Sequence, residues 1–527
     1  NGAVTLSSTL NGAFDFDISS GTGAVAINGV TGGTAALASL DINNAAGSGT
    51  IEVNNIGAGA AGVTGATRIG NANTTQLTLD GTVYNTDGTQ TYTAVAGNTI
   101  DLTAGATTTF TSTNDAITFA TGTVDMANGS NLVVNSAGGD ISVAGIAGTS
   151  VEDVTLNAAA GNVTVGAIGA AAAEINDVTI TGATINLGGD ILTDDDAGAA
   201  GDVDLNGAVV LTNGVTIDTS AGNGTVDLSS TLNGAFDFDI SSASGAVQIT
   251  GVIGGSTALA TLDINALAGS GAITISDNIG RGTTGVTGAT QIGNATTTTL
   301  TFAGTDYITN TATYTSAIGN NIDLTAGATT TFTSSNDAIT FGTGTVELAN
   351  GSNLVVNYNG AGAGNITLVA VKGTSTENVT LNAGADQVTV GQIGAAAAEI
   401  NDVTITGGQI NLGGFIRTDD GDGAGDVDLN GAVVLTAAVT IDTSAGEGTV
   451  DLSSTLDGAF DFDIVSGAGS VVIQGTTGAT TPLASFDINE SGGTGTIEVS
   501  SIGAAGAAGV TNATRFGNVA TTDLTLD

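Results

Sequence analysis

Short segments in which apolar and polar residues alternate recur along the whole chain. Val4-Thr5-Leu6, Ile100-Asp101-Leu102 and Val163-Thr164-Val165 are three of them, and Gly, Asn or Ser residues separate most segments from the next. Alternation with a period of two indicates a β-strand that buries one face, and the abundance of Val, Ile and Thr favours strands. The pattern predicts an all-β protein made of many short strands.

The spacing of the inward-facing residues predicts how these strands are arranged. Between Leu102 and Val143 the apolar positions return every 7 to 9 residues. Three such strands would complete a coil of roughly 20 to 25 residues, which is typical of the turns of a β-solenoid. We therefore expect a parallel β-helix in which each strand pairs with its equivalents in the turns above and below.

The composition fits a thin core built from small and β-branched side chains. The 527 residues include 83 Gly and one Pro, no Trp, and only 4% aromatics. Gly and Asn suit corners with positive φ, whereas Pro would remove a hydrogen bond from the ladder. A string of β-sandwich modules is the competing interpretation, but sandwich cores normally contain bulky aromatics. The composition favours the solenoid.

A much longer period divides the chain into near-copies. The string TLNGAFDFDISS begins at Thr9 and again at Thr231, and TLDGAFDFDI begins at Thr455, so the steps are 222 and 224 residues. We predict a first copy at 1–222, a second at 223–446 and a partial third at 447–527. The copies are expected to form one continuous rod, cut from a longer array, and not independent domains.

The charge balance excludes two classes of partner. The chain has 5 Lys and Arg against 50 Asp and Glu, which gives a formal net charge of -45. Five scattered cations cannot neutralise a run of phosphates, so we expect no binding to nucleic acid or to anionic membranes. No apolar stretch approaches the roughly 20 residues of a spanning helix, so we expect no direct membrane insertion.

Catalytic chemistry has few candidate residues. The chain contains no His and no Cys, which excludes Ser-His-Asp triads and sites with His or thiolate ligands. Lys372 and Arg417 occur only in the second copy, where the first has Ala147 and Leu192. Near-copies that lack each other's basic residues do not share an active site. We predict that the protein is not an enzyme, with a polysaccharide-active β-helix enzyme as the least favoured alternative.

Two acidic, Gly-rich segments are candidate Ca²⁺ loops. TDDDAGAAGDVDLNG begins at Thr193, and TDDGDGAGDVDLNG begins at Thr418. Ca²⁺ takes six to eight oxygen ligands and is often held by carboxylates on flexible loops. The alternative is a solvated acidic loop without an ion, and the sequence leaves both open. The candidate ligands are Asp194, Asp195, Asp196, Asp202, Asp204, Asp419, Asp420, Asp422, Asp426 and Asp428.

Several strings resemble a known group of bacterial proteins. TAALASLDIN from Thr34, TPLASFDIN from Thr481 and GAVVLTNGVTIDTSAGNGTV from Gly207 are similar to repeats of the filamentous-haemagglutinin-like and autotransporter-like exoproteins. The resemblance implies a right-handed parallel β-helix and export across a Gram-negative envelope. It also implies a place outside the cell, on the cell surface or at the outer membrane, and a role in adhesion, biofilm or fibre formation.

The pattern, charge and resemblance together predict a structural protein. We expect a segment of an extracellular cell-surface fibre, surface layer or matrix, with the stalk of a large adhesin as the alternative. The expected partners are further copies of the chain, by axial stacking or bundling, and host surfaces, abiotic surfaces or polysaccharide.

Overall fold

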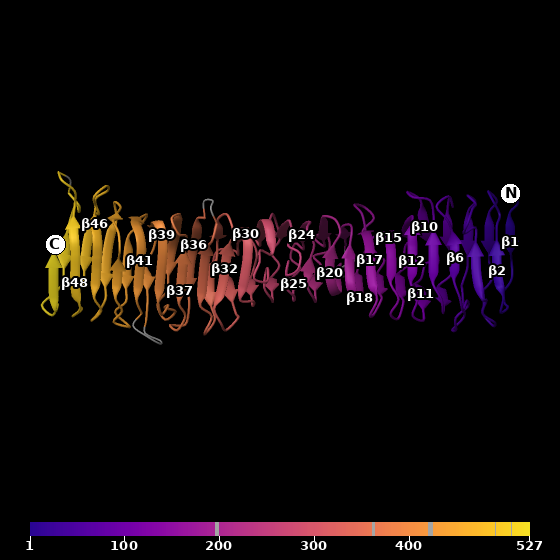
Figure 1. The fold of residues 1–527 in the computed structure, drawn as a ribbon, viewed down its shortest axis with the longest axis horizontal. Coiled ribbons are helices and arrows are strands. Elements are labelled where there is room, and N and C mark those ends of the chain that lie inside the picture. The colour runs from indigo at the N-terminus through magenta and orange to yellow at the C-terminus, as the bar shows by residue number, and fades with distance from the viewer. Residues whose placement is uncertain (195–199, 361–363, 420–424, 491, 507, 527) are drawn as a thin grey trace. The chain divides into compact units, whose positions relative to one another are not determined.

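Parallel strands stacked turn upon turn form the protein (Figure 1). The computed structural model describes residues 1–194, 200–360, 364–419, 425–490, 492–506 and 508–526. These residues contain strands but no helix, and the strands make a β-solenoid of about 21 turns. The prediction of an all-β solenoid is confirmed.

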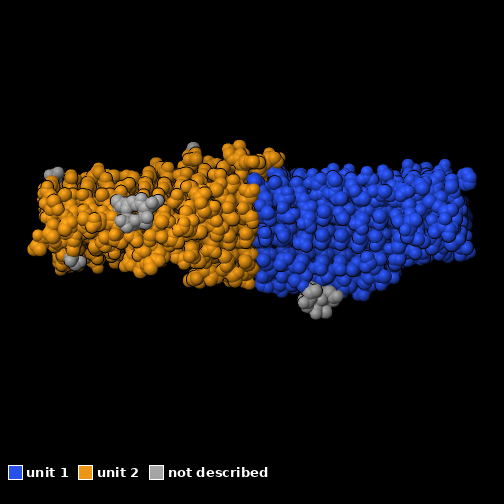
Figure 2. Space-filling model, turned by 90° about the horizontal axis from the view of Figure 1, so that it is seen from below, with its two compact units in different colours: residues 1–252 blue, residues 253–527 orange. Residues whose placement is uncertain are grey.

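Two compact units make up the chain, residues 1–252 and residues 253–527 (Figure 2). Each unit contains three ladders of parallel strands, one for each side of the turn. The division into sequence copies at 222/223 and 446/447 stays a prediction.

The ladders of unit 1 are named A, B and C in the order in which the chain visits them. Ladder A contains β1 (Val4–Leu6), β3 (Val25–Ile27), β5 (Ile51–Val53), β7 (Leu77–Leu79), β10 (Thr99–Leu102), β13 (Thr123–Met126), β19 (Ile191–Leu192), β21 (Val215–Asp218) and β24 (Asp237–Ser241). Ladder B contains β8 (Val83–Thr86), β11 (Thr108–Ser112), β14 (Leu132–Asn135), β16 (Val154–Asn157), β22 (Val226–Leu228) and β25 (Val247–Ile249). Ladder C contains β2 (Asp15–Ile18), β4 (Ser39–Ile42), β6 (Thr67–Gly70), β9 (Gln90–Thr93), β12 (Ile117–Thr121) and β23 (Leu232–Asn233). Four longer strands turn a corner: β15 (Ile141–Ala147) and β17 (Asn162–Ile168) run from C into A, and β18 (Val178–Leu187) and β20 (Val203–Leu211) run from B into C.

The ladders of unit 2 are named D, E and F in the same way. Ladder D contains β27 (Ile273–Ile275), β29 (Leu300–Phe302), β31 (Asn321–Leu324), β34 (Thr345–Leu348), β40 (Ile416–Arg417), β42 (Val439–Asp442), β45 (Asp461–Val465), β47 (Ser485–Ile488) and β49 (Thr514–Phe516). Ladder E contains β32 (Thr330–Ser334), β35 (Leu354–Tyr358), β37 (Val379–Asn382), β43 (Val450–Leu452) and β50 (Asp523–Leu526), and ladder F contains β26 (Thr261–Ile264), β33 (Ile339–Phe341) and β44 (Leu456–Asp457). Six strands run from E into F, namely β28 (Val286–Ile292), β30 (Asp306–Tyr314), β39 (Val403–Leu412), β41 (Val427–Leu435), β46 (Val471–Thr477) and β48 (Thr496–Ile502). The strands β36 (Ile366–Lys372) and β38 (Gln387–Ile393) run from F into D.

In-register pairing fixes the length of each turn. Val4 pairs with Val25, and Phe486 pairs with Thr514, so residues paired between the named strands lie 21 to 28 positions apart. The range is slightly wider than the predicted 20 to 25 residues because the corners differ in length while the strands stay short.

The core contains aromatic side chains, although the low aromatic content predicts a core of small and β-branched residues. Most of the few aromatic residues are buried, and they stack on the rings of neighbouring turns. Tyr84 and Phe110 are stacked with ring centroids 4.7 Å apart, and Phe110 lies edge-on to Phe119 at 5.0 Å. Parallel in-register turns place like residues above one another at the strand spacing of about 4.8 Å, which suits stacked rings.

One sequence copy is not a whole number of turns. Nine steps of pairing along ladder A carry Val4 to Ile217, through Val25, Ile51, Leu77, Ile100, Val124, Ile146, Ile168 and Ile191. Val226, the sequence equivalent of Val4, comes after Ile217 and lies in ladder B. A copy therefore spans about nine and one third turns.

The same shift of one ladder appears elsewhere in each unit. In unit 1, β2 lies in ladder C whereas its sequence equivalent β24 lies in ladder A. In unit 2, β26 lies in ladder F whereas its equivalent β47 lies in ladder D. A surface feature that occurs once per copy is thus presented on the next side of the solenoid in the following copy.

Candidate functional site

Pairs of aspartates from neighbouring turns lie side by side on the outer faces of the strands. In-register pairing places Asp204 beside Asp227 in unit 1, and Asp428 beside Asp451 in unit 2. Partial burial raises the pKa of Asp204 and of Asp428, and the negative charges of the neighbouring aspartates raise it further. These aspartate pairs are therefore sites of like-charge repulsion between turns.

This repulsion predicts a stabilising substitution. Asp428→Asn should raise the free energy of unfolding by about 0.2 to 1 kcal/mol at neutral pH, because it removes one charge from the pair with Asp451. Folded pKa values above the unfolded value mean that these carboxyls disfavour folding as the pH rises through the folded pKa. Urea denaturation at low salt and at about 1 M salt measures the gain, which should shrink when the Debye length falls to about 3 Å, because salt screens the repulsion from Asp451 but not the burial of Asp428. A gain that is unchanged at high salt would contradict the electrostatic cause.

Two of the predicted Ca²⁺ ligands are hydrogen-bond acceptors between turns. Asp202 Oδ1 accepts hydrogen bonds from the Thr225 backbone N–H (2.7 Å) and Oγ1 (3.0 Å) of the next turn. The backbone N–H of Asp202 donates to Asp177 Oδ1 of the preceding turn at 2.9 Å. Asp426 makes the same pair of bonds to Thr449, at 2.8 and 3.0 Å. These carboxylates tie successive turns together at one corner.

The other predicted ligands are spread over the loop and the adjoining strand. The backbone N–H groups of Asp194 and Asp419 donate to Ile175 O and Ile400 O, and Asp204 and Asp428 face outward from β20 and β41. The remaining candidates, Asp195, Asp196, Asp420 and Asp422, lie outside the described residues. Within the described part of the chain, no three Asp or Glu residues are grouped so that they could hold a metal ion. The Ca²⁺ loops stay a prediction.

A buried glutamate that the sequence analysis missed closes one loop in each copy. Glu377 Oε2 accepts the Thr374 backbone N–H at 2.6 Å, and Oε1 accepts the Gly351 N–H of the preceding turn at 2.9 Å. Glu152 makes equivalent bonds to Thr149 (2.6 Å) and Gly129 (2.8 Å). The side chains of both glutamates are sealed from solvent, so each carboxylate is a fixed clamp between two turns.

The repeated string GTSxE was the available signal for this clamp. It reads GTSVE at 148–152 and GTSTE at 373–377. The glycine is required because a Cβ at Gly373 would lie 2.8 Å from Glu377 Oε2. The string alone does not distinguish a buried glutamate from one on a polar surface loop, because the burial depends on hydrogen bonds to the preceding turn.

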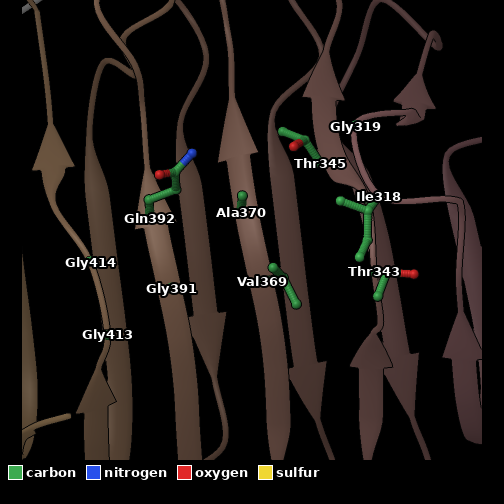
Figure 3. A pocket seen from close by; sticks show the side chains of 11 residues that line it. Ile318, Gly319, Thr343, Thr345, Val369, Ala370, Gly391, Gln392, Gly413 and Gly414 are labelled. Atoms are coloured by element: carbon green, nitrogen blue, oxygen red, sulfur yellow. The ribbon is translucent and has the colours of Figure 1, made fainter. Parts of the chain in front are cut away.

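An open groove of about 470 Å³ lies at the corner between ladders F and D (Figure 3). Five successive turns build it, and Gly391, Gly413 and Gly414 form much of its floor. Two aliphatic side chains project beside these glycines: Ile318 is 85% exposed and Val369 is 47% exposed. The groove runs across the turns and has no buried titratable group among its lining residues.

Two of the three basic residues of the second copy, Lys372 and Arg417, lie within three positions of residues that line this groove. Lys372 Nζ forms an ion pair with Glu347 Oε2 at 3.2 Å, and the Arg417 guanidinium lies over the ring of Phe415 at 5.3 Å from its centroid. Lys372 follows Val369 in β36, and Arg417 follows Gly414 in the turn that closes the groove. Glu347, the ion-pair partner of Lys372, is paired in register with Asp323 of the preceding turn; partial burial raises the pKa of Asp323, and the negative charge of Glu347 raises it further.

Comparison with known proteins identified no relative: no protein-family model, no curated protein and no solved structure matches the chain. None of the described elements is an apolar helix of membrane-spanning length.

Proposed function

We propose that the chain is a structural segment of an extracellular bacterial fibre, surface layer or matrix. The observation that carries this proposal is the continuous parallel stacking of turns within each unit. Each described turn is joined to its neighbours by parallel ladders, and also by side-chain bonds such as those of Asp202 and Glu377. A fold held together in this way gives length and an extended outer surface.

The fractional turn of the sequence copy supports the same role. Because a copy spans about nine and one third turns, chemically equal patches occur on all three sides over three copies. A fibre that meets neighbours from several directions gains from such a distribution, whereas a protein with a single binding face does not.

The acidic surface suits a location where cations are plentiful. A net charge of -45 makes neighbouring solenoids repel one another, and salt at physiological strength screens that repulsion beyond about 8 Å. The same charge discourages side-by-side aggregation of strand edges. Export to the cell exterior also agrees with the resemblance to bacterial exoproteins.

Immunogold electron microscopy of the producing cells tests the proposal. Antibodies against the 527-residue segment should label continuous filaments or a layer of uniform thickness outside the cell. Label confined to discrete stalks with a distinct head would replace the fibre with an adhesin stalk. Label confined to the cytoplasm would contradict both.

A further inference from the structure

The groove between ladders F and D has an exposed aliphatic side chain, Ile318, at one end and two adjacent glycines, Gly413 and Gly414, at the other end. In Figure 3, Ile318 lies at one end, Gly413 and Gly414 lie at the other end, and Val369 lies between them. Along the solenoid, Ile318 is two turns before Val369, and Gly414 is two turns after it. The projecting side chain of Ile318 and the glycines at 413 and 414 therefore lie two turns from Val369, on opposite sides of it.

We propose that this corner is an interface at which a second copy of the chain docks side by side, with the axes of the two solenoids antiparallel. A two-fold axis near Val369 would place Ile318 of each copy over Gly413 and Gly414 of the other. An interface of this kind is isologous, since residue i meets residue j and residue j meets residue i. The inference rests on the proposed function, because it names the surface by which neighbouring solenoids associate.

Charge along the corner permits this approach although the whole chain is strongly acidic. Lys372 and Arg417, two of the five basic residues, lie beside the groove. In the antiparallel arrangement, Arg417 two turns after Val369 would face Asp323 of the second copy, two turns before its Val369. The corner is thus one place where two chains of net charge -45 can meet without strong repulsion.

The first copy of the sequence provides a natural comparison. At the positions of Ile318, Val369, Phe415 and Arg417 it has Ala96, Ala144, Asp190 and Leu192. Unit 1 accommodates these smaller or acidic residues in the same strands and corners, and Ala144, like Val369, is exposed. The apolar projections of unit 2 are therefore not needed to form the corner, and they leave apolar surface for a partner.

Disulfide trapping tests the two-fold geometry, because the chain has no cysteine of its own. Val369→Cys lies near the proposed axis, so two copies should form a covalent dimer under mild oxidation. Ala144→Cys, at the equivalent place in the first copy, is the matched control and should remain largely monomeric. Equal trapping of both variants, or none for Val369→Cys, would overturn the inference.

Sedimentation equilibrium of the full chain gives an independent measurement. The double variant Ile318→Ala/Val369→Ala restores the first-copy residues and should raise the dimer dissociation constant by about tenfold or more. Circular dichroism establishes that the variant is folded. If the wild type and the double variant associate equally well, the proposed interface at this corner is wrong. A fibre could then still form through other contacts. If the two copies dimerise through this corner as expected while microscopy finds no extracellular assembly, the proposed function is wrong but the proposed interface is supported.

Discussion

Phe110→Ala should lower the free energy of unfolding of unit 1 by about 3 to 5 kcal/mol. The Phe110 ring is fully buried, is stacked on Tyr84 with centroids 4.7 Å apart, and lies edge-on to Tyr92 at 5.2 Å and Phe119 at 5.0 Å. The hydrogen-bonded ladders hold the turns at their spacing, so the core cannot collapse into the space that the ring leaves. A large cavity term is therefore expected in addition to the lost burial.

Urea denaturation followed by far-ultraviolet circular dichroism measures this loss. Phe14→Ala is the matched control, because its ring is 80% exposed and its removal should change the free energy of unfolding by about 0.5 kcal/mol or less. Similar losses for the two variants would show that the aromatic stack does not stabilise the core as described.

Glu377→Gln should lower the free energy of unfolding of unit 2 by about 1.5 to 3 kcal/mol at pH 7. The glutamine amide keeps one acceptor oxygen, so it could accept from only one of the backbone N–H groups of Thr374 and Gly351. Its NH2 group would face the other N–H donor, which would lose its acceptor. Burial alone would raise the pKa of Glu377. The hydrogen bonds from Thr376, Thr374 and Gly351 outweigh burial and hold the pKa below its ordinary value of 4.5.

The pH dependence of this loss follows from the direction of that pKa shift. A folded pKa below the unfolded pKa stabilises the protein above the unfolded pKa, and the stabilisation is lost as the pH falls through the folded value. The difference between wild type and Glu377→Gln should therefore be largest near neutrality and should shrink below about pH 4.5. Glu498→Gln, on the exposed face of β48, is the control and should have little effect. A difference that stays constant from pH 7 to pH 3 would rule out the ionised clamp.

The sequence was sufficient to predict strands and solenoid because both follow from local alternation. Val4-Thr5-Leu6 and the other alternating segments place their first and third side chains inward and the second outward, independently of the sequence of the next turn. The register of one turn upon the next could not be predicted in this way, because it depends on corners whose lengths vary between turns. The shift of Val226 into the ladder next to that of Val4 comes from the summed corner lengths of nine turns, which no single segment reveals.

The candidate sites were predictable only in part, for the same reason. The aspartates at 202 and 426 were visible as acidic residues, but their hydrogen bonds to Thr225 and Thr449 require knowledge of which residues are neighbours across turns. Gly391 and Gly414 form one groove floor although 23 positions separate them, because a full turn brings them together. Lys372 and Arg417 stood out as basic residues without a counterpart in the first copy, yet their place beside the groove was not predictable.

The equivalence of the sequence copies makes the central claim open to a direct measurement. Asn223 and Glu447, which begin the second and third copies, have the same left-handed backbone, with φ of 59° and 56°. A variant that lacks residues 223–446 would therefore join equivalent points of the solenoid and keep its pairing.

Cryo-electron microscopy of the wild type and of this deletion variant, compared by contour length, is that measurement. If each copy adds about nine and one third turns at about 4.8 Å per turn, the variant should be shorter by about 45 Å and equal in width. A variant of unchanged length and smaller width, or particles composed of separate compact globules, would contradict the account.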